Sequence, residues 1–155
     1  MKYEICGKGF LGGAAFDYFG SRHFPAPFFS SKEFQYAKSS PIDERNCPDI
    51  FLNVSGPSSI EKSFMMPELY LTSPLNQVKF QLENLSLLNK PPHYVYVSSA
   101  SVYGECLGLI PSEDSEFNPI SPYASGKVEV EQFLLSKKMD YAGGITVIRA
   151  TSVFS

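Results

Sequence analysis

Tyr123 and Lys127 form the pair in this sequence that is best suited to acid–base chemistry. They begin and end the segment Tyr-Ala-Ser-Gly-Lys, which follows Ser121-Pro122 and therefore opens an expected helix. Residues four positions apart share one face of a helix, so the ammonium group of Lys127 is expected beside the phenol of Tyr123. A nearby cation favours the phenolate, which lets the phenol act as a general acid and base. The alternative is that Tyr123 only packs the helix against its neighbours.

A glycine-rich turn at residues 7–12 could bind phosphate groups. Its sequence, Gly-Lys-Gly-Phe-Leu-Gly, has the GxGxxG spacing. The turn lies between an apolar strand expected at Tyr3–Cys6 and a helix expected at Phe10–Phe19, which is the context that a dinucleotide site requires. The segment therefore predicts a dinucleotide site, with a merely structural turn as the alternative.

Each residue of this turn would serve the binding of a dinucleotide in a different way. Gly7 would permit the tight turn, Gly9 would let the backbone approach a pyrophosphate, and Gly12 would let the helix pack closely on the strand. Phe10 and Leu11 open the helix, whose free N–H groups and positive end attract phosphate.

The residues that would recognise the cofactor ribose favour NADP over NAD. Dinucleotide-binding folds usually carry an acidic residue about 20 positions after the glycines, where it binds the ribose 2′-hydroxyl. Here that region holds Ser30, Ser31 and Lys32, with hydroxyls and a cation in place of a carboxylate that would repel a 2′-phosphate. NAD stays open, because Glu33 could serve if the register differs, and a solvated turn is the further alternative.

Strand-sized apolar runs alternate with helical patterns along the chain. After the first strand, we expect strands at Ala26–Ser30, Asp49–Val54, Tyr94–Ser98 and Ile145–Arg149. Continuous rather than alternating runs indicate strands that are buried on both faces, as in a parallel sheet. The alternation with helices predicts an α/β fold with a doubly wound parallel sheet and right-handed crossovers.

Two further helices are expected to begin at a Ser-Pro pair, which suits an N-cap and first helical position. The helix from Ser73-Pro74 shows apolar residues at spacings of three and four, namely Leu75, Val78, Leu82, Leu85 and Leu88. The helix from Ser121-Pro122 aligns Tyr123, Lys127, Val130 and Leu134 on one face. Between Ser31 and Asp49 there is no room for a helix plus a strand, so the sheet is expected to be trimmed around its third strand.

Length and composition restrict the classes of function. The 155 residues correspond to one domain, residues 1–155, and 43% hydrophobic residues exclude disorder. A net charge of −3 argues against nucleic acid or an anionic membrane as the main partner. No apolar run is long enough to span a bilayer, and the polar N-terminus does not suit a secretory signal, so we expect a cytoplasmic protein.

The three cysteines, Cys6, Cys47 and Cys106, give an odd count without a CxxC pair. This pattern suggests neither a disulfide framework nor a zinc site, and no metal is expected. Thiols in the core of a protein from a reducing compartment are the interpretation that we adopt.

Three motifs in fixed order carry a family resemblance. They are GKGFLG at residues 7–12, SSASVYG at residues 98–104 and NPISPYASGK at residues 118–127. Together they strongly resemble the extended short-chain dehydrogenase/reductase family, and within it the NAD(P)-dependent nucleotide-sugar epimerases, dehydratases and reductases. The resemblance extends from Tyr3 to Phe154, where the last six residues from Arg149 look like the family's R-x-x-N-V-Y segment.

The resemblance implies a Rossmann-like dinucleotide-binding domain and a role for each site residue. Tyr123 would be the catalytic acid/base, and Lys127 would bind the nicotinamide ribose hydroxyls and favour the phenolate. Ser99 would hydrogen-bond the reacting hydroxyl or carbonyl of a nucleotide-sugar substrate, and Ser101 would be a secondary substrate contact. The pair Ser55–Gly56 would lie along the cofactor.

The same motif distinguishes activities within the family. Dehydratases of the family usually carry an Asp-Glu pair directly after the active-site hydroxyl, because water elimination needs its own acid and base. Here Ala100 and Ser101 stand at those positions, which favours an epimerase or ketoreductase. The alternative is that Ser99 and Tyr103 are only polar residues at a strand end.

Departures from the family pattern leave a second function open. Cys6 stands in place of an upstream glycine, Ser73-Pro74 replaces a helix asparagine, and the family's N-V-Y-G tail is altered at Ser152–Ser155. Family members continue into a C-terminal substrate domain, which this chain of 155 residues lacks, so it is expected to turn over sugar nucleotides poorly alone. A homo-oligomer or a partner chain could complete the site. A non-catalytic NADP(H)-binding module, or a remnant without ligand, is the alternative.

Overall fold

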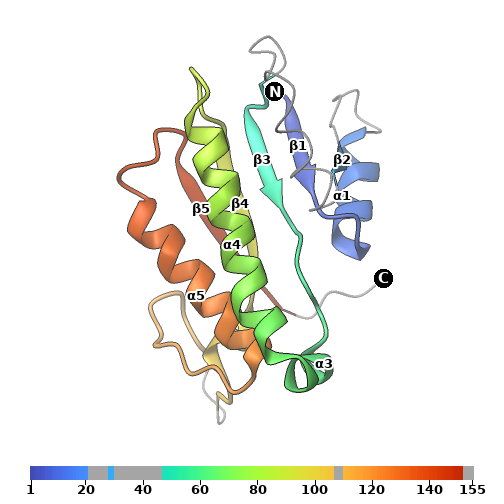
Figure 1. Cartoon of the computed structure of the whole chain (residues 1–155), viewed down its shortest axis with the longest axis vertical. Helices are drawn as coiled ribbons and strands as arrows, with labels where there is room; N and C mark the ends of the chain where they lie inside the picture. The colour runs from blue at the N-terminus through green and yellow to red at the C-terminus, as the bar shows by residue number, and fades with distance from the viewer. Residues whose placement is uncertain (21–27, 30–46, 107–109, 152–155) are drawn as a thin grey trace.

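The computed structural model describes residues 1–20, 28–29, 47–106 and 110–151, and five parallel strands within them form one sheet (Figure 1). The strands lie in the order β2-β1-β3-β4-β5. Their bounds are Tyr3–Cys6 (β1), Phe28–Phe29 (β2), Ile50–Asn53 (β3), His93–Ser99 (β4) and Ile145–Ala150 (β5). The parallel sheet and its five strands are confirmed. The expected trimming around the third strand concerns residues 30–46, which lie outside the described residues.

Helices connect the strands and cover both faces of the sheet. Their bounds are Phe10–Gly20 (α1), Ile60–Met65 (α3), Pro67–Ser86 (α4) and Pro122–Lys137 (α5), with a 3-10 turn, η3, at Ala100–Tyr103. The sequence had not indicated α3 or η3, both of which are too short to show a helical period. Figure 1 shows α4 and α5 side by side over β4 and β5.

Alternation along β1 places α1 and α4 on opposite faces of the sheet. The ring of Tyr3 stacks on Phe19 of α1, with 4.3 Å between the ring centroids. Cys6, three residues further along β1, accepts a hydrogen bond from Gln81 of α4 at 3.2 Å. Side chains three positions apart on a strand point to opposite faces. The sheet is therefore covered on both faces, as the doubly wound Rossmann-like fold requires.

The hydrophobic core lies between the sheet and the pair α4–α5. Buried residues of the sheet, of these two helices and of the segments that directly follow the helices form one cluster: Cys6, Phe51, Val78, Leu82, Leu85, Leu88, Tyr94, Tyr96, Val130, Leu134, Tyr141 and Ile145. The apolar spacing expected in both helices is thus confirmed. Burying one such aliphatic side chain contributes about 1.5–3 kcal/mol. This packing fixes the two helices on the sheet.

The prediction that α4 begins at Ser73-Pro74 is wrong. The helix begins at Pro67, a proline at the first position, and Pro74 lies inside it. An interior proline removes the hydrogen bond to the carbonyl four residues earlier, here that of Tyr70. That carbonyl instead lies against Gly126 of α5, where a Cβ would come within 2.0 Å of it. Close packing on α5 thus accommodates the interruption that the sequence suggested would end the helix.

The predicted start of α5 is confirmed. Ser121 is extended and its hydroxyl accepts a hydrogen bond from the backbone N–H of Ala124 at 3.2 Å. Pro122 occupies the first helical position, where its missing N–H costs nothing. The cap sets the point from which Tyr123 and Lys127 project.

The partly buried acid Glu4 on β1 makes stability depend on pH. Burial raises the pKa of Glu4 from 4.5 to about 7. Between these values the folded chain keeps a proton that the unfolded chain has lost, so the free energy of unfolding falls as pH rises through this window. The loss amounts to roughly 3 kcal/mol above pH 7. We expect Glu4→Gln to remove this slope and to stabilise the protein at pH 8, measured by urea unfolding.

The exposed Glu83 on α4 provides the matched control for this measurement. Glu83→Gln should keep the wild-type dependence of stability on pH. An unchanged slope in Glu4→Gln would contradict the prediction.

Candidate functional site

Three glycines shape the turn between β1 and α1, each for a different reason. Gly7 has φ +124°, and a Cβ there would lie 2.8 Å from the backbone nitrogen of Ser55. A Cβ on Gly12 would lie 1.6 Å from the carbonyl oxygen of Gly7, so the helix start packs directly on the turn. A Cβ on Gly9 would meet no protein atom within 4 Å. The first two glycines serve backbone packing, whereas the third borders open space.

A cleft of about 530 Å³ lies at the carboxyl ends of the strands. It is lined by Gly7, Lys8, Gly9, Phe10, Leu11, Val54, Ser55, Gly56, Ser58, Ser98, Ser99, Tyr123, Ala150 and Thr151. The chain passes from β1 to β2 on one side and then returns to β3 on the other, so the strand order reverses at β1 and β3. Ligands of open α/β sheets bind at this switch point. The cleft unites the glycine turn with Ser99 and Tyr123.

Ser55 is held at the edge of this cleft by two side chains that the sequence analysis missed. Its hydroxyl donates to Oδ1 of Asn53 at 2.5 Å and accepts from Nε2 of Gln77 at 2.6 Å. Its backbone N–H donates to the same Asn53 oxygen at 2.9 Å. In the sequence, Asn53 stands out because it is a polar residue within the apolar run at Asp49–Val54. These bonds fix the rotamer and the backbone of Ser55.

Asn53 belongs to a buried polar group beneath the cleft. Its amide nitrogen donates to Oε1 of Gln81 at 2.8 Å and to the hydroxyl of Tyr94 at 2.9 Å. Gln81 in turn donates to the sulfur of Cys6. Burial raises the pKa of the Cys6 thiol, so this sulfur is a neutral partner. Hydrogen bonding throughout the group offsets the cost of burying amides in a core.

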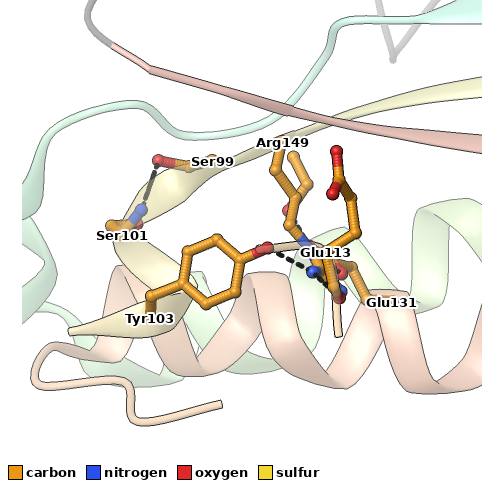
Figure 2. A network of polar contacts seen from close by, with 7 residues as sticks. Ser99, Ser101, Tyr103, Glu113, Glu131 and Arg149 are labelled. Carbon is orange, nitrogen blue, oxygen red and sulfur yellow. Dashed lines mark hydrogen bonds and ion pairs between the residues drawn. The ribbon is translucent and has the colours of Figure 1, made fainter. Parts of the chain in front are cut away.

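Ser99 ends β4 and faces the cleft. Its hydroxyl caps η3 by accepting from the backbone N–H of Ser101 at 3.2 Å, and it accepts from the Ser101 hydroxyl at 3.0 Å. Figure 2 shows Ser101 turned toward Ser99. Among the described residues the Ser99 hydroxyl donates to no partner, so its proton is available to a ligand. Ser101 is not among the residues that line the cleft and acts on it through Ser99.

Tyr123 lines the same cleft from α5, and its hydroxyl has no hydrogen-bond partner among the described residues. Its ring contacts that of Tyr70 edge-on at 6.4 Å. Nζ of Lys127 lies 6.0 Å from the centroid of the Tyr123 ring, beside it as expected. The ammonium group donates to the carbonyl of Val97 at 3.0 Å and lies 4.7 Å from the centre of the Tyr96 ring.

Lys127 is buried, which shifts its protonation. Desolvation lowers the pKa of Lys127 to about 8, and the carboxylate of Glu131 opposes this effect. Lys127 lines a small pocket that adjoins the cleft and shares Tyr123 and Gly56 with it. The lysine therefore lies next to the cleft, beside Tyr123.

Two predicted cofactor residues within the described part of the chain, Gly12 and Lys127, are not among the residues that line the cleft. Gly12 acts through packing on Gly7. Ser30, Ser31 and Lys32 lie outside the described residues, so the prediction about the ribose 2′-position stays a prediction.

A charged network beside the site was not anticipated. Glu131 of α5 accepts hydrogen bonds from Ser98 and from Nε of Arg149 on β5, the latter at 2.8 Å. Nη1 of Arg149 also donates to the hydroxyl of Tyr103 at 2.5 Å and to the carbonyl of Glu113 at 2.7 Å (Figure 2). The sequence signal for this network is that Glu131 follows Lys127 by four residues, which is about one helical turn.

The described part of the chain holds neither a metal-binding cluster nor a membrane-spanning helix. No cluster of three histidine, cysteine or acidic residues there could hold a metal ion. No helix in the same part is long and apolar enough to cross a membrane.

Several known proteins are similar to this chain in sequence or in fold. A curated protein of Schizosaccharomyces pombe, described as uncharacterised, is 34% identical over 112 residues, which are 66% of this chain and 30% of that protein. UDP-glucose 4-epimerase from Brucella ovis in complex with NAD superposes with a TM-score of 0.80 at 16% identity, over 96% of this chain and 51% of the other.

RMD from Pseudomonas aeruginosa in complex with NADPH likewise gives a TM-score of 0.80 at 20% identity, over 97% of this chain and 55% of the other. The chain thus spans about half the length of these solved structures, which share its fold. A family model described as NAD dependent epimerase/dehydratase family matches residues 30–155. Since that match covers most of the sequence, the chain belongs to the NAD dependent epimerase/dehydratase family.

Proposed function

We propose that this chain binds a nicotinamide dinucleotide and supplies the acid–base residues of an epimerase or ketoreductase that acts on nucleotide sugars. One observation carries the proposal: a single cleft joins the glycine turn of β1–α1 to Ser99 and Tyr123. A cofactor on the turn and a substrate hydroxyl at Ser99 would thus share one space. Family membership supports the same conclusion.

The residues around the turn suit the dinucleotide. Gly9 lines the cleft, and the space that a Cβ would occupy there holds no protein atom and is open to a ligand. The start of α1 presents backbone N–H groups and the positive end of a helix to phosphate groups. Ser55 and Gly56 line the cleft next to the turn, along the expected path of the cofactor. A bound nicotinamide would supply hydride transfer.

The chain's own side chains would move the proton. The Ser99 hydroxyl would donate to the reacting oxygen, because it accepts two hydrogen bonds and donates none among the described residues. The phenol of Tyr123 would take or give the proton of the same oxygen. The Lys127 ammonium would favour the phenolate of Tyr123 by its charge and would bind the ribose hydroxyls from below.

A nucleotide sugar is the substrate class that the relatives favour. The Brucella ovis structure is of a UDP-glucose 4-epimerase. Ala100 and Ser101, in place of a carboxylate pair, favour epimerisation or reduction over dehydration. We also propose that sugar recognition involves protein beyond these 155 residues, in the same polypeptide, in another copy or in a partner chain.

Replacing Gly9 tests the cofactor site. Gly9→Val should weaken the binding of NADH and NADPH at least tenfold, because the new side chain occupies the space where the pyrophosphate approaches the backbone. Folding should be unaffected, since a Cβ at this position meets no protein atom. Nicotinamide fluorescence measures the affinity.

Gly13 provides the matched control, because its Cβ would also meet no protein atom and it does not line the cleft. Gly13→Val should bind like the wild type. Equal affinity in both variants would refute the glycine turn as the phosphate site.

The choice of cofactor is tested in the same titration. NADPH should bind more tightly than NADH, because Ser30, Ser31 and Lys32 offer hydroxyls and a cation to the 2′-phosphate. Ser30→Asp should reverse the order, since a carboxylate repels that phosphate. A wild-type preference for NADH would contradict the prediction.

Turnover tests the reaction. Chromatographically monomeric protein is assayed with a panel of nucleotide sugars for epimer interconversion and for oxidation of NADPH. We expect slow turnover that Tyr123→Phe lowers about 100-fold or more, because general acid–base catalysis contributes that much. Dinucleotide affinity should remain near that of the wild type.

Tyr18→Phe on α1 is the matched control, since this tyrosine is half exposed and does not line the cleft. Turnover that survives Tyr123→Phe would remove the proposed acid/base. Dinucleotide binding without any product would favour a non-catalytic NADP(H)-binding module, and elimination of water would favour a dehydratase.

A further inference from the structure

Glu131 is a buried acid that joins three elements of the fold. Only 1% of its surface is exposed. One carboxylate oxygen accepts a hydrogen bond from Ser98 of β4, and the other accepts from Nε of Arg149 on β5 at 2.8 Å. Through this single side chain, α5 is bound to both neighbouring strands. Ser98 is the residue directly before Ser99, so the attachment lies next to the candidate site.

Arg149 is itself held on several sides. Besides Glu131, its guanidinium donates to the hydroxyl of Tyr103 and to the backbone carbonyl of Glu113. Its guanidinium also lies against the rings of Tyr103 and Phe117, with 5.0 Å and 4.9 Å to their centroids. Figure 2 shows Tyr103 of η3, Glu131 of α5 and Glu113 gathered around Arg149 of β5. Arg149 therefore presents a fixed positive charge to Glu131.

Spacing along α5 connects this network to the candidate catalytic pair. Tyr123, Lys127 and Glu131 follow one another at intervals of four and lie on one face of the helix. Lys127 and Glu131 are both buried, and the carboxylate acts on the ammonium through an interior that screens charge weakly. The ammonium group also contacts the backbone carbonyl of Val97 and the rings of Tyr96 and Tyr123.

Other elements contribute no comparable charge. From α4, Tyr70 lies against the ring of Tyr123. The charged residues of α3, Glu61 and Lys62, are exposed. Within the described residues, Glu131 is thus the one acid that acts on the buried Lys127.

We propose that Glu131 and Arg149 are positioning residues for the candidate site: Arg149 holds Glu131 between α5 and the strand ends, and the fixed negative charge of Glu131 keeps Lys127 as an ammonium ion beneath Tyr123. Their role in catalysis rests on the proposed function, whereas the electrostatic coupling itself requires no cofactor. Burial alone favours a neutral lysine, which would not support a phenolate. The network counteracts this tendency.

The coupling is measured directly by NMR on the protein labelled with ¹³C at lysine Cε. The Lys127 signal is assigned by its loss in Lys127→Arg, and its titration midpoint is followed from pH 6 to pH 10. Wild-type Lys127 should titrate near pH 8. Glu131→Gln should lower this midpoint by about one pH unit, because the buried opposite charge is gone.

Glu129 supplies the matched control, since it lies on the same helix but is exposed. Glu129→Gln should leave the Lys127 midpoint within about 0.2 pH units of the wild type, because an exposed charge is screened by solvent. A purely structural role for Glu131 would not move the Lys127 midpoint. Equal midpoints in the wild type and Glu131→Gln would overturn the proposal.

A second variant keeps the proposal testable should Glu131→Gln not fold. Glu131→Met combined with Arg149→Met should fold, because replacing a buried ion pair by apolar side chains is often tolerated. Its Lys127 midpoint should also lie below that of the wild type, and a midpoint equal to that of the wild type would overturn the proposal.

The two proposals fail separately. If the chain bound no dinucleotide but the Lys127 midpoint shifted as expected, the proposed function would be removed and the coupling would remain. Normal binding of NADPH with no shift would remove the coupling and leave the proposed function.

Discussion

Backbone packed directly on backbone at the end of β1 is the constraint on which the cleft depends. The carbonyl of Gly7 lies where a Cβ of Gly12 would stand, and Gly7 itself packs on the backbone of Ser55. No side chain separates the first strand, the first helix and the turn after β3. The N-terminus of α1 is consequently brought to the switch point of the sheet, where the same cleft reaches Ser99 and Tyr123.

The opposite wall of the cleft depends on charge rather than on close backbone packing. Burying Lys127 and Glu131 costs free energy that only partners can offset. The backbone carbonyl of Val97 is one partner, and Arg149 and Ser98 are others. These contacts all lie at the ends of β4 and β5. The wall that carries the tyrosine is therefore specified by polar contacts with definite geometry.

Much of the fold could be predicted because its signals are local. Continuous apolar runs identify the five strands, and Ser121-Pro122 identifies the start of α5. The prediction failed at Ser73-Pro74, because the helix continues through Pro74 and the carbonyl of Tyr70, which loses its helical partner there, packs against Gly126 of the neighbouring helix. This packing is a tertiary contact between two helices, and the spacing of residues along the sequence does not reveal it.

The candidate site likewise contains some residues that the sequence predicts and others that it does not. The GxGxxG turn and the pair Tyr123 and Lys127 are recognisable because their spacing encodes a shape. The partners of Ser55, by contrast, come from residues 53 and 77, and those of Glu131 from residues 98 and 149. Only the folded sheet brings such distant positions together, so no single stretch of sequence predicts them.

Pro74 has a consequence for motion. It interrupts the hydrogen-bond ladder of α4 and separates two segments with very different anchoring. The first, Pro67–Ser73, buries only Tyr70, whereas the second buries Val78, Gln81, Leu82 and Leu85. Local opening requires little free energy where few groups are buried. The first turns of α4 can therefore fray while the rest stays in place, and because Tyr70 contacts Tyr123, this fraying would be transmitted to the phenol at the cleft.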